Sequence, residues 1–130
     1  MSHRRLKFWG WGHEDQTLSE TEARDIATRI GGLTGLSPNG YIAPPTLDEI
    51  SLDAPRLTAP QSLANICSTR AYDRAAHTYG KSYPDYIRAY ARDFSNAPDM
   101  VAFPESESDI VALLDWADGA GAAVIPFGCG

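Results

Sequence analysis

The pattern most suggestive of binding chemistry in this 130-residue chain is its last stretch, VIPFGCG. Residues 123–126 are typical of a short buried strand. Gly128 and Gly130 follow it and lack a Cβ atom, so the backbone there can come close to a ligand. The spacing predicts the first part of a binding loop.

Side chains that carry catalysis in other proteins are scattered along this chain. The three histidines, His3, His13 and His77, have no second ligand at the spacing of a zinc site. No Ser/His/Asp pattern marks a nucleophile, and no pair of carboxylates can be placed across a pocket. We therefore expect no metal site and assign no catalytic residue.

Composition and charge limit the class of partner. A formal net charge of −6 disfavours nonspecific binding to nucleic acid or to an anionic membrane, because both need a basic field. No apolar run approaches the roughly 18 residues of a membrane span, and the N-terminus lacks the apolar core of a signal peptide. Cys67 and Cys129 have neither metal-ligand nor redox-pair spacing, so we expect free thiols in a reducing, cytoplasmic compartment.

The elements that would position the loop lie in residues 98–130. We predict parallel strands near residues 101–103 and 124–126, joined by a helix over about residues 107–120 in a right-handed βαβ unit. Ser106 and the acidic residues after it favour the start of that helix. Apolar residues recur at helical spacing within it: Ile110, Val111, Leu114 and Ala117. Because such a unit needs both faces covered, we also expect exposed apolar surface.

The region before it, residues 1–97, is predicted as an extension that begins with an arm, a helix and an extended connection. An irregular arm containing Phe8, Trp9 and Trp11 should pack as an aromatic anchor. A capping box from Ser19 to Glu22 then predicts a short helix that stops at Gly31-Gly32. Five prolines between residues 33 and 60 predict an extended connection.

Two further helical patterns close this region. The first runs from about residue 61 to 79, with a break near Cys67-Ser68, and the second is capped by Ser82 with Pro84 in its first turn. Five tyrosines lie along them at helical spacing, which favours packing over a platform for stacking bases: Tyr72, Tyr79, Tyr83, Tyr86 and Tyr90. The whole chain is thus predicted to be α+β, an aromatic arm and helices followed by one βαβ unit.

The segment PDMVAFPESESDIVALLDWADGAGAAVIPFGCG resembles the beginning of the flavin-binding (PCMH-type) domain of the vanillyl-alcohol oxidase / p-cresol methylhydroxylase superfamily. Upstream, RRLKFWGWGHED and YPDYIRAYARDFSNAPDMVAFP are similar to the N-terminal region of alkyldihydroxyacetonephosphate synthase-like proteins and their bacterial FAD-linked oxidase relatives. The most specific parts are residues 7–12 and 99–130.

This resemblance implies FAD as cofactor, with its pyrophosphate against backbone amides of the glycine-rich loop. Carried over residue by residue, the loop begins with Pro126, Phe127, Gly128, Cys129 and Gly130. The family commonly has glycine where this chain has Cys129, for which we expect a passive, small-residue role.

The resemblance also implies a protein several times longer, with a small-molecule or lipid-like substrate and a possible homodimer. The chemistry is either exchange of an acyl for an alkyl chain on a dihydroxyacetone phosphate ester or oxidation of a hydroxy acid or related alcohol, and both remain open. The alternative is a catalytically inactive, truncated fragment with only a structural or interaction role. Nucleic-acid binding through the tyrosines is disfavoured by the charge balance.

Overall fold

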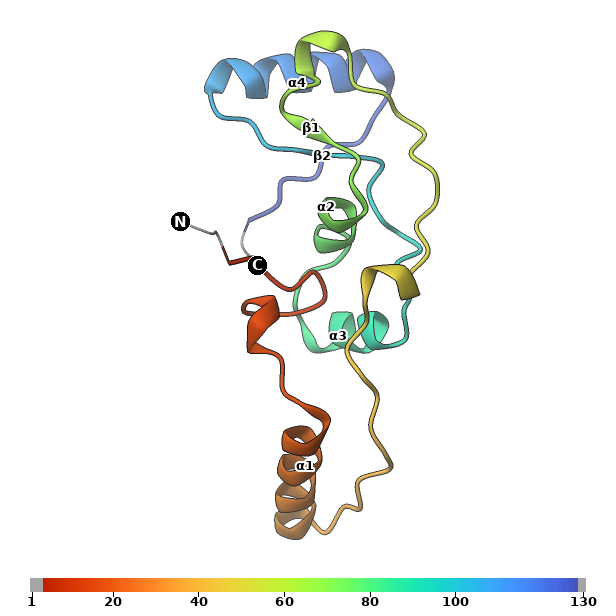
Figure 1. Cartoon of the computed structure of the whole chain (residues 1–130). Helices are drawn as coiled ribbons and strands as arrows, with labels where there is room; N and C mark the ends of the chain where they lie inside the picture. The colour runs from red at the N-terminus through yellow and green to blue at the C-terminus, as the bar shows by residue number, and fades with distance from the viewer. Residues whose placement is uncertain (1–3, 129–130) are drawn as a thin grey trace.

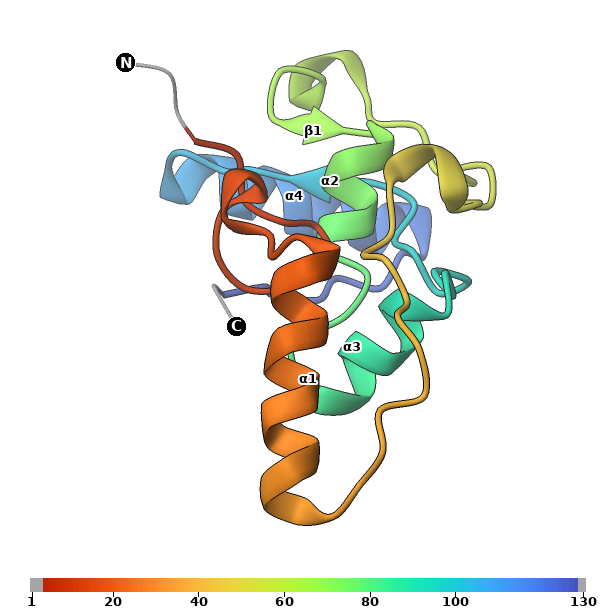
Figure 2. The same cartoon turned by 60° about the horizontal axis from the view of Figure 1, so that its bottom comes forward.

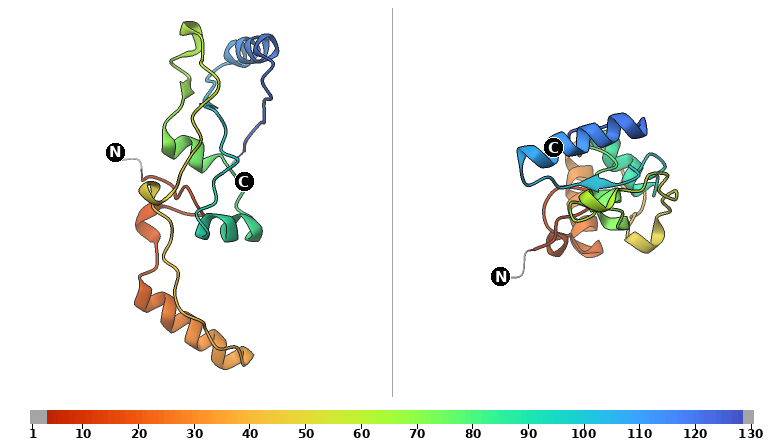
Figure 3. Two further views of the ribbon diagram at one scale, coloured as in Figure 1. Left: turned by 90° about the vertical axis from the view of Figure 1, so that its right-hand side faces the viewer. Right: turned by 90° about the horizontal axis from the view of Figure 1, so that it is seen from above.

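The computed structural model describes residues 4–128. The molecule is elongated, with helix α4 (Glu107–Ala120) at one end and helix α1 (Glu20–Thr34) at the other (Figures 1 and 3). Between them lie helices α2 (Ala71–Ala76) and α3 (Tyr83–Tyr90) and a small sheet. Single turns of 3₁₀ helix occur at η1 (Glu14–Gln16), η2 (Leu47–Glu49) and η3 (Gln61–Leu63). This is a mixed helical fold with little sheet.

The sheet is antiparallel, and the predicted parallel pairing is wrong. Strand β1 (Cys67–Ser68) pairs with strand β2 (Val101–Ala102), with Cys67 opposite Ala102. A further bond, from the Phe103 N–H to the Ile66 carbonyl at 2.8 Å, extends the ladder. The hydrogen-bonded neighbour of β2 is therefore Cys67–Ser68, at the expected break in the helical pattern of residues 61–79, and not residues 124–126.

Residues 123–128 adopt no regular secondary structure, so the second strand of the predicted βαβ unit is absent from the described residues. The segment returns from α4 toward the middle of the molecule instead of lying beside β2 (Figure 3). Val124 is 52% exposed and Ile125 is 84% exposed. A parallel strand is stable where both of its faces are covered, and the described residues leave Ile125 almost fully exposed and Val124 half exposed.

Helix α4 confirms the prediction over its whole length. The Ser106 hydroxyl accepts from the Asp109 N–H at 3.2 Å, and the Asp109 carboxylate accepts from the N–H groups of Ser106 and Glu105. The helix ends at Gly121, whose φ of 64° is a left-handed cap. Of the predicted apolar face only Ala117 is buried, because the helix turns residues 113, 116 and 117 toward the body.

Helix α1 begins as predicted but continues past the expected stop at Gly31-Gly32 to Thr34. The Glu22 carboxylate accepts from the Ser19 N–H and hydroxyl, which completes the capping box. The helix passes through Gly31 and Gly32 and stops at Gly35, where φ is 74°. A Cβ on Gly31 would lie 2.5 Å from the Leu36 carbonyl oxygen, so this glycine lets the chain fold back over the helix end rather than stopping it.

The predicted helical pattern at residues 61–79 holds only in part. Its first residues form η3 and its break is β1, so helix proper is confined to α2. Helix α3 is confirmed, with the Asp85 carboxylate accepting from the Ser82 N–H at 3.1 Å and its hydroxyl at 2.6 Å. The connection between α1 and η3 is extended apart from η2, as the prolines predict.

The core lies where the N-terminal arm meets α2 and α3 (Figure 2). The buried side chains there are Phe8, Ala75, Ala89 and Phe94. Trp9 packs edge-on against the Tyr90 ring, with the ring centroids 5.6 Å apart. The arm is thus an aromatic anchor, as predicted, and its neighbouring tyrosines have packing contacts.

Large apolar side chains stay exposed on α1, α4 and the last described segment, which confirms the expected apolar surface. Leu33 on α1 is 89% exposed. In the described part of the chain, every helix is too short or too polar to cross a bilayer.

Candidate functional site

Three of the five predicted cofactor-binding residues lie within the described part of the chain. Pro126, Phe127 and Gly128 follow α4 in the extended segment, whereas Cys129 and Gly130 fall outside the described residues. Within residues 4–128, no hydrogen bond uses a backbone group of residues 123–128. Among residues 4–128, the N–H groups that precede and follow Pro126 thus have no hydrogen-bond partner.

The start of the predicted loop is held by aromatic contacts. The Phe127 ring lies against the His77 ring, with centroids 4.6 Å apart and planes inclined by 59°. On another edge, His77 meets Phe103, which directly follows β2, at 5.8 Å and 81°. His77 thus joins the end of β2 to the residue before Gly128.

Helix α2 fixes the position of His77. The residue caps the C-terminus of α2, and its Nδ1 lies 2.7 Å from the Asp73 carbonyl oxygen. The Asp73 carboxylate in turn accepts from the Ser68 hydroxyl and from Arg70 Nε at 2.8 Å. Burial alone would raise the pKa of Asp73, but these hydrogen bonds and the Arg70 charge hold it below its usual value.

An open hollow of about 430 Å³ lies beside the sheet. Its lining is mixed polar and apolar: Asn65, Ile66, Cys67, Ser68, Thr69, Arg70, Phe103 and Glu105. The polar side chains best able to bind a ligand, Ser68 and Arg70, are already bonded to Asp73. Burial raises the pKa of the Cys67 thiol, which lowers the fraction of reactive thiolate. We assign no role to this hollow.

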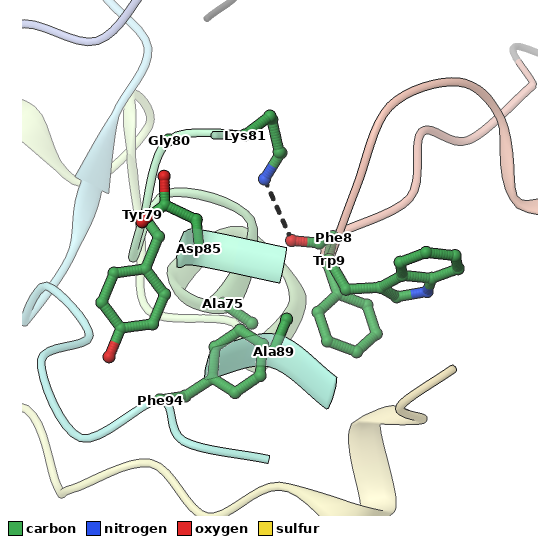
Figure 4. A pocket seen from close by; sticks show the side chains of 9 residues that line it. All are labelled: Phe8, Trp9, Ala75, Tyr79, Gly80, Lys81, Asp85, Ala89 and Phe94. Carbon is green, nitrogen blue, oxygen red and sulfur yellow. Dashed lines mark hydrogen bonds between the residues drawn. The ribbon is translucent and has the colours of Figure 1, made fainter. Parts of the chain in front are cut away.

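A second cavity, of about 10 Å³, lies under the arm (Figure 4). Lys81 Nζ donates across it to the Phe8 carbonyl at 3.2 Å and to the Ala76 carbonyl at 3.4 Å. Burial lowers the pKa of Lys81, and the nearby Asp85 partly offsets this effect. The Tyr79 hydroxyl is buried without a partner in the described residues, and the cavity has room for at most one water. The residues around this cavity pack the arm against α2 and α3.

Among the described residues, no three His, Cys, Asp or Glu side chains gather in a way that could hold a metal ion. What the structure does show is that His77 holds the segment after α4 against the body through its contact with Phe127. No local sequence signal points to His77, because the residues it contacts lie 26 and 50 positions further along the chain.

Two curated proteins resemble part of the chain in sequence. The alkyldihydroxyacetonephosphate synthase of Dictyostelium discoideum is 37% identical over 57 residues, which are 44% of this chain and 9% of that protein. The synthase of Trypanosoma brucei brucei is 35% identical over 60 residues, 46% of this chain and 10% of that protein. No family model matches the chain.

Solved structures match the fold over nearly its whole length. Two crystal forms of alkyldihydroxyacetonephosphate synthase superpose with TM-scores of 0.72 and 0.67, each at 22% identity and over 95% of this chain. This chain covers only 28% and 27% of the length of the two synthase chains. The expected resemblance to alkyldihydroxyacetonephosphate synthase-like proteins is thus confirmed, and the fold corresponds to a part of the synthase fold.

Proposed function

We propose, from this resemblance to alkyldihydroxyacetonephosphate synthase, that the chain contributes the first part of an FAD pyrophosphate loop in an FAD-linked oxidase or synthase. The observation that carries the proposal is the fold match over 95% of the chain, with a TM-score of 0.72. The proposed contacts are those of Pro126, Phe127 and Gly128, continued by Cys129 and Gly130. The division at residues 97 and 98 into an extension and a flavin-binding part belongs to the same proposal.

The local chemistry supports an anion site made of backbone groups. Gly128 is exposed, and a Cβ placed on it would meet no atom within 4 Å. An added methyl group is therefore harmless to the chain itself but would hold a phosphate away from the backbone. Backbone N–H donors attract the negative charge of a pyrophosphate without cationic side chains, so a net charge of −6 is no obstacle.

When bound, FAD would supply the electron or adduct chemistry, while this chain binds and orients its phosphates. We propose a small-molecule or lipid-like substrate for the whole protein, with either acyl-for-alkyl exchange or oxidation of a hydroxy acid as its reaction. Homodimer formation is part of the same proposal. None of the described side chains is assigned a catalytic role.

The test is a titration of FAD into the chain, and into the chain extended at Gly130 by the corresponding downstream residues of the Dictyostelium synthase. Quenching of flavin fluorescence reports binding, and riboflavin, which has no phosphate, is titrated in parallel. We expect Gly128→Ala to weaken FAD about tenfold or more and to leave riboflavin unchanged. Absence of saturable FAD binding by both chains would contradict the proposal.

A catalytically inactive fragment with a structural or interaction role is the second candidate. It is favoured by the exposed apolar side chains of α4 and of the segment after it, including Val111 at 57% and Ile125 at 84%. In that case the chain would associate with further polypeptide without binding FAD, and analytical ultracentrifugation of the FAD-free chain would show concentration-dependent association.

A further inference from the structure

We propose that His77 is a positioning residue that seats the start of the cofactor loop by clamping Phe127. This inference rests on the proposed function for its consequence, but its geometry is a feature of the chain alone. His77 lies between Phe127 at 4.6 Å and Phe103 at 5.8 Å, measured between ring centroids.

The contact between His77 and Phe127 matters because the other residues of the segment after α4 have few contacts. Ile125 is 84% exposed and Val124 is 52% exposed, so Ile125 has few contacts with the body and Val124 is only half covered. Phe127 is 45% exposed, and its aromatic contact within the described residues is with His77. Because Gly128 is the next residue, holding Phe127 also fixes the direction in which the loop leaves the body.

His77 is itself rigidly placed, which a clamp requires. A backbone carbonyl only accepts hydrogen bonds, so the 2.7 Å contact with the Asp73 carbonyl places the hydrogen on Nδ1. Asp73 is 4% exposed and its carboxylate is bonded to Ser68 and Arg70. The imidazole is therefore fixed at one edge by the end of α2 and at another by Phe103.

The geometry explains why a histidine suits this position. Phenylalanine would supply the aromatic face but not the bond to the Asp73 carbonyl, and asparagine would supply a donor without the face. Tilted and edge-on aromatic pairs stabilise by an amount that corresponds to about a two- to tenfold change in an equilibrium constant. Removing the clamp should weaken FAD binding by a factor in that range.

The experiment compares His77→Ala, His77→Phe and the wild type, in the chain as it is and in the extended chain described above. A nuclear Overhauser effect between the His77 and Phe127 rings reports the contact, and FAD and riboflavin titrations report its consequence. We expect the contact in the wild type, about two- to tenfold weaker FAD binding with His77→Ala, and a smaller loss with His77→Phe. Tyr83→Ala is the matched control, because that aromatic residue is 78% exposed and is not one of the rings that pack against His77.

The outcomes separate the two proposals. Absence of the contact in the wild type overturns the positioning role whatever the cofactor does. If the contact is present but His77→Ala binds FAD like the wild type, or if Tyr83→Ala weakens FAD binding equally, the role is also overturned. If neither wild-type chain binds FAD, the proposed function fails, and with it the positioning role, even where the aromatic contact is observed.

Discussion

The docking of the N-terminal arm depends on Gly10, and replacing this residue with alanine is the sharpest test of the fold. Gly10 is buried where the arm crosses α3. An added Cβ would lie 2.8 Å from the Tyr86 hydroxyl oxygen and 3.0 Å from two of its ring carbons. Contacts this short do not occur, so either the arm or the tyrosine must move.

Tyr86 is not free to move. Its hydroxyl accepts the Trp11 N–H at 2.8 Å, and its ring packs edge-on against Trp9 with centroids 6.3 Å apart. Losing the hydrogen bond costs about 1 kcal/mol, and overpacking adds about 1–3 kcal/mol. The reduced entropy of the unfolded chain returns about 0.4–1 kcal/mol. We expect Gly10→Ala to lower the free energy of unfolding by about 2 kcal/mol.

Equilibrium urea denaturation followed by far-UV circular dichroism measures this loss. Gly32→Ala is the control: Gly32 lies in α1, and its added Cβ would have no atom within 4 Å. Because Gly32 is inside α1, we expect that variant to be stabilised by up to about 1 kcal/mol. Tyr86→Phe removes the closest atom and should reduce the effect of Gly10→Ala in a double-mutant cycle. Equal stabilities for the two glycine variants would refute the argument.

Three further predictions concern other contacts. Hydrogen bonds from the Arg56 side chain and N–H lower the pKa of Asp99. These bonds therefore stabilise the folded state fully above the pKa that Asp99 has in the unfolded chain, about 4, and this stabilisation is lost as the pH falls through the pKa of the folded state. Asp99→Asn should thus be less stable than the wild type at pH 7, with a difference that closes in acid denaturation curves below about pH 4. Ser106→Ala removes the acceptor for the Asp109 N–H and should cost about 1 kcal/mol in urea denaturation, whereas Ser108→Ala on the same turn should cost less. Ile30→Glu should change the unfolding free energy by less than about 0.5 kcal/mol, because Ile30 is 53% exposed on α1, and a larger loss would mean that this face is covered.

The sequence predicted the elements whose signals are local. The capping pairs that begin α1, α3 and α4 each lie within four residues, and all three form. The end of α1 was misplaced because glycine has two uses that look alike in a sequence. Gly31 serves a close approach of the chain, whereas Gly35 supplies the left-handed cap.

Contacts between distant segments were not predictable from these signals. Cys67-Ser68 is too short for strand alternation to be visible, and its partner Val101–Ala102 lies more than 30 residues away. The candidate site likewise depends on contacts between distant segments. The glycines of the loop are evident in the sequence, but the contact of His77 with Phe127 exists only because α2 and the segment after α4 meet in space.

The connection between α2 and α3 links the arm to the candidate loop. At its start, His77 contacts Phe127. Near its end, the Lys81 carbonyl accepts the Trp11 indole N–H at 3.2 Å, while Lys81 Nζ donates to the Phe8 carbonyl. The contacts with the arm and with Phe127 both involve residues 77–81, so displacing the arm should also change the contact between His77 and Phe127. We therefore expect Gly10→Ala to shift the His77 ring resonances in NMR spectra, and Gly32→Ala to leave them in place; unchanged resonances in the first variant would show that the arm and the loop are supported independently.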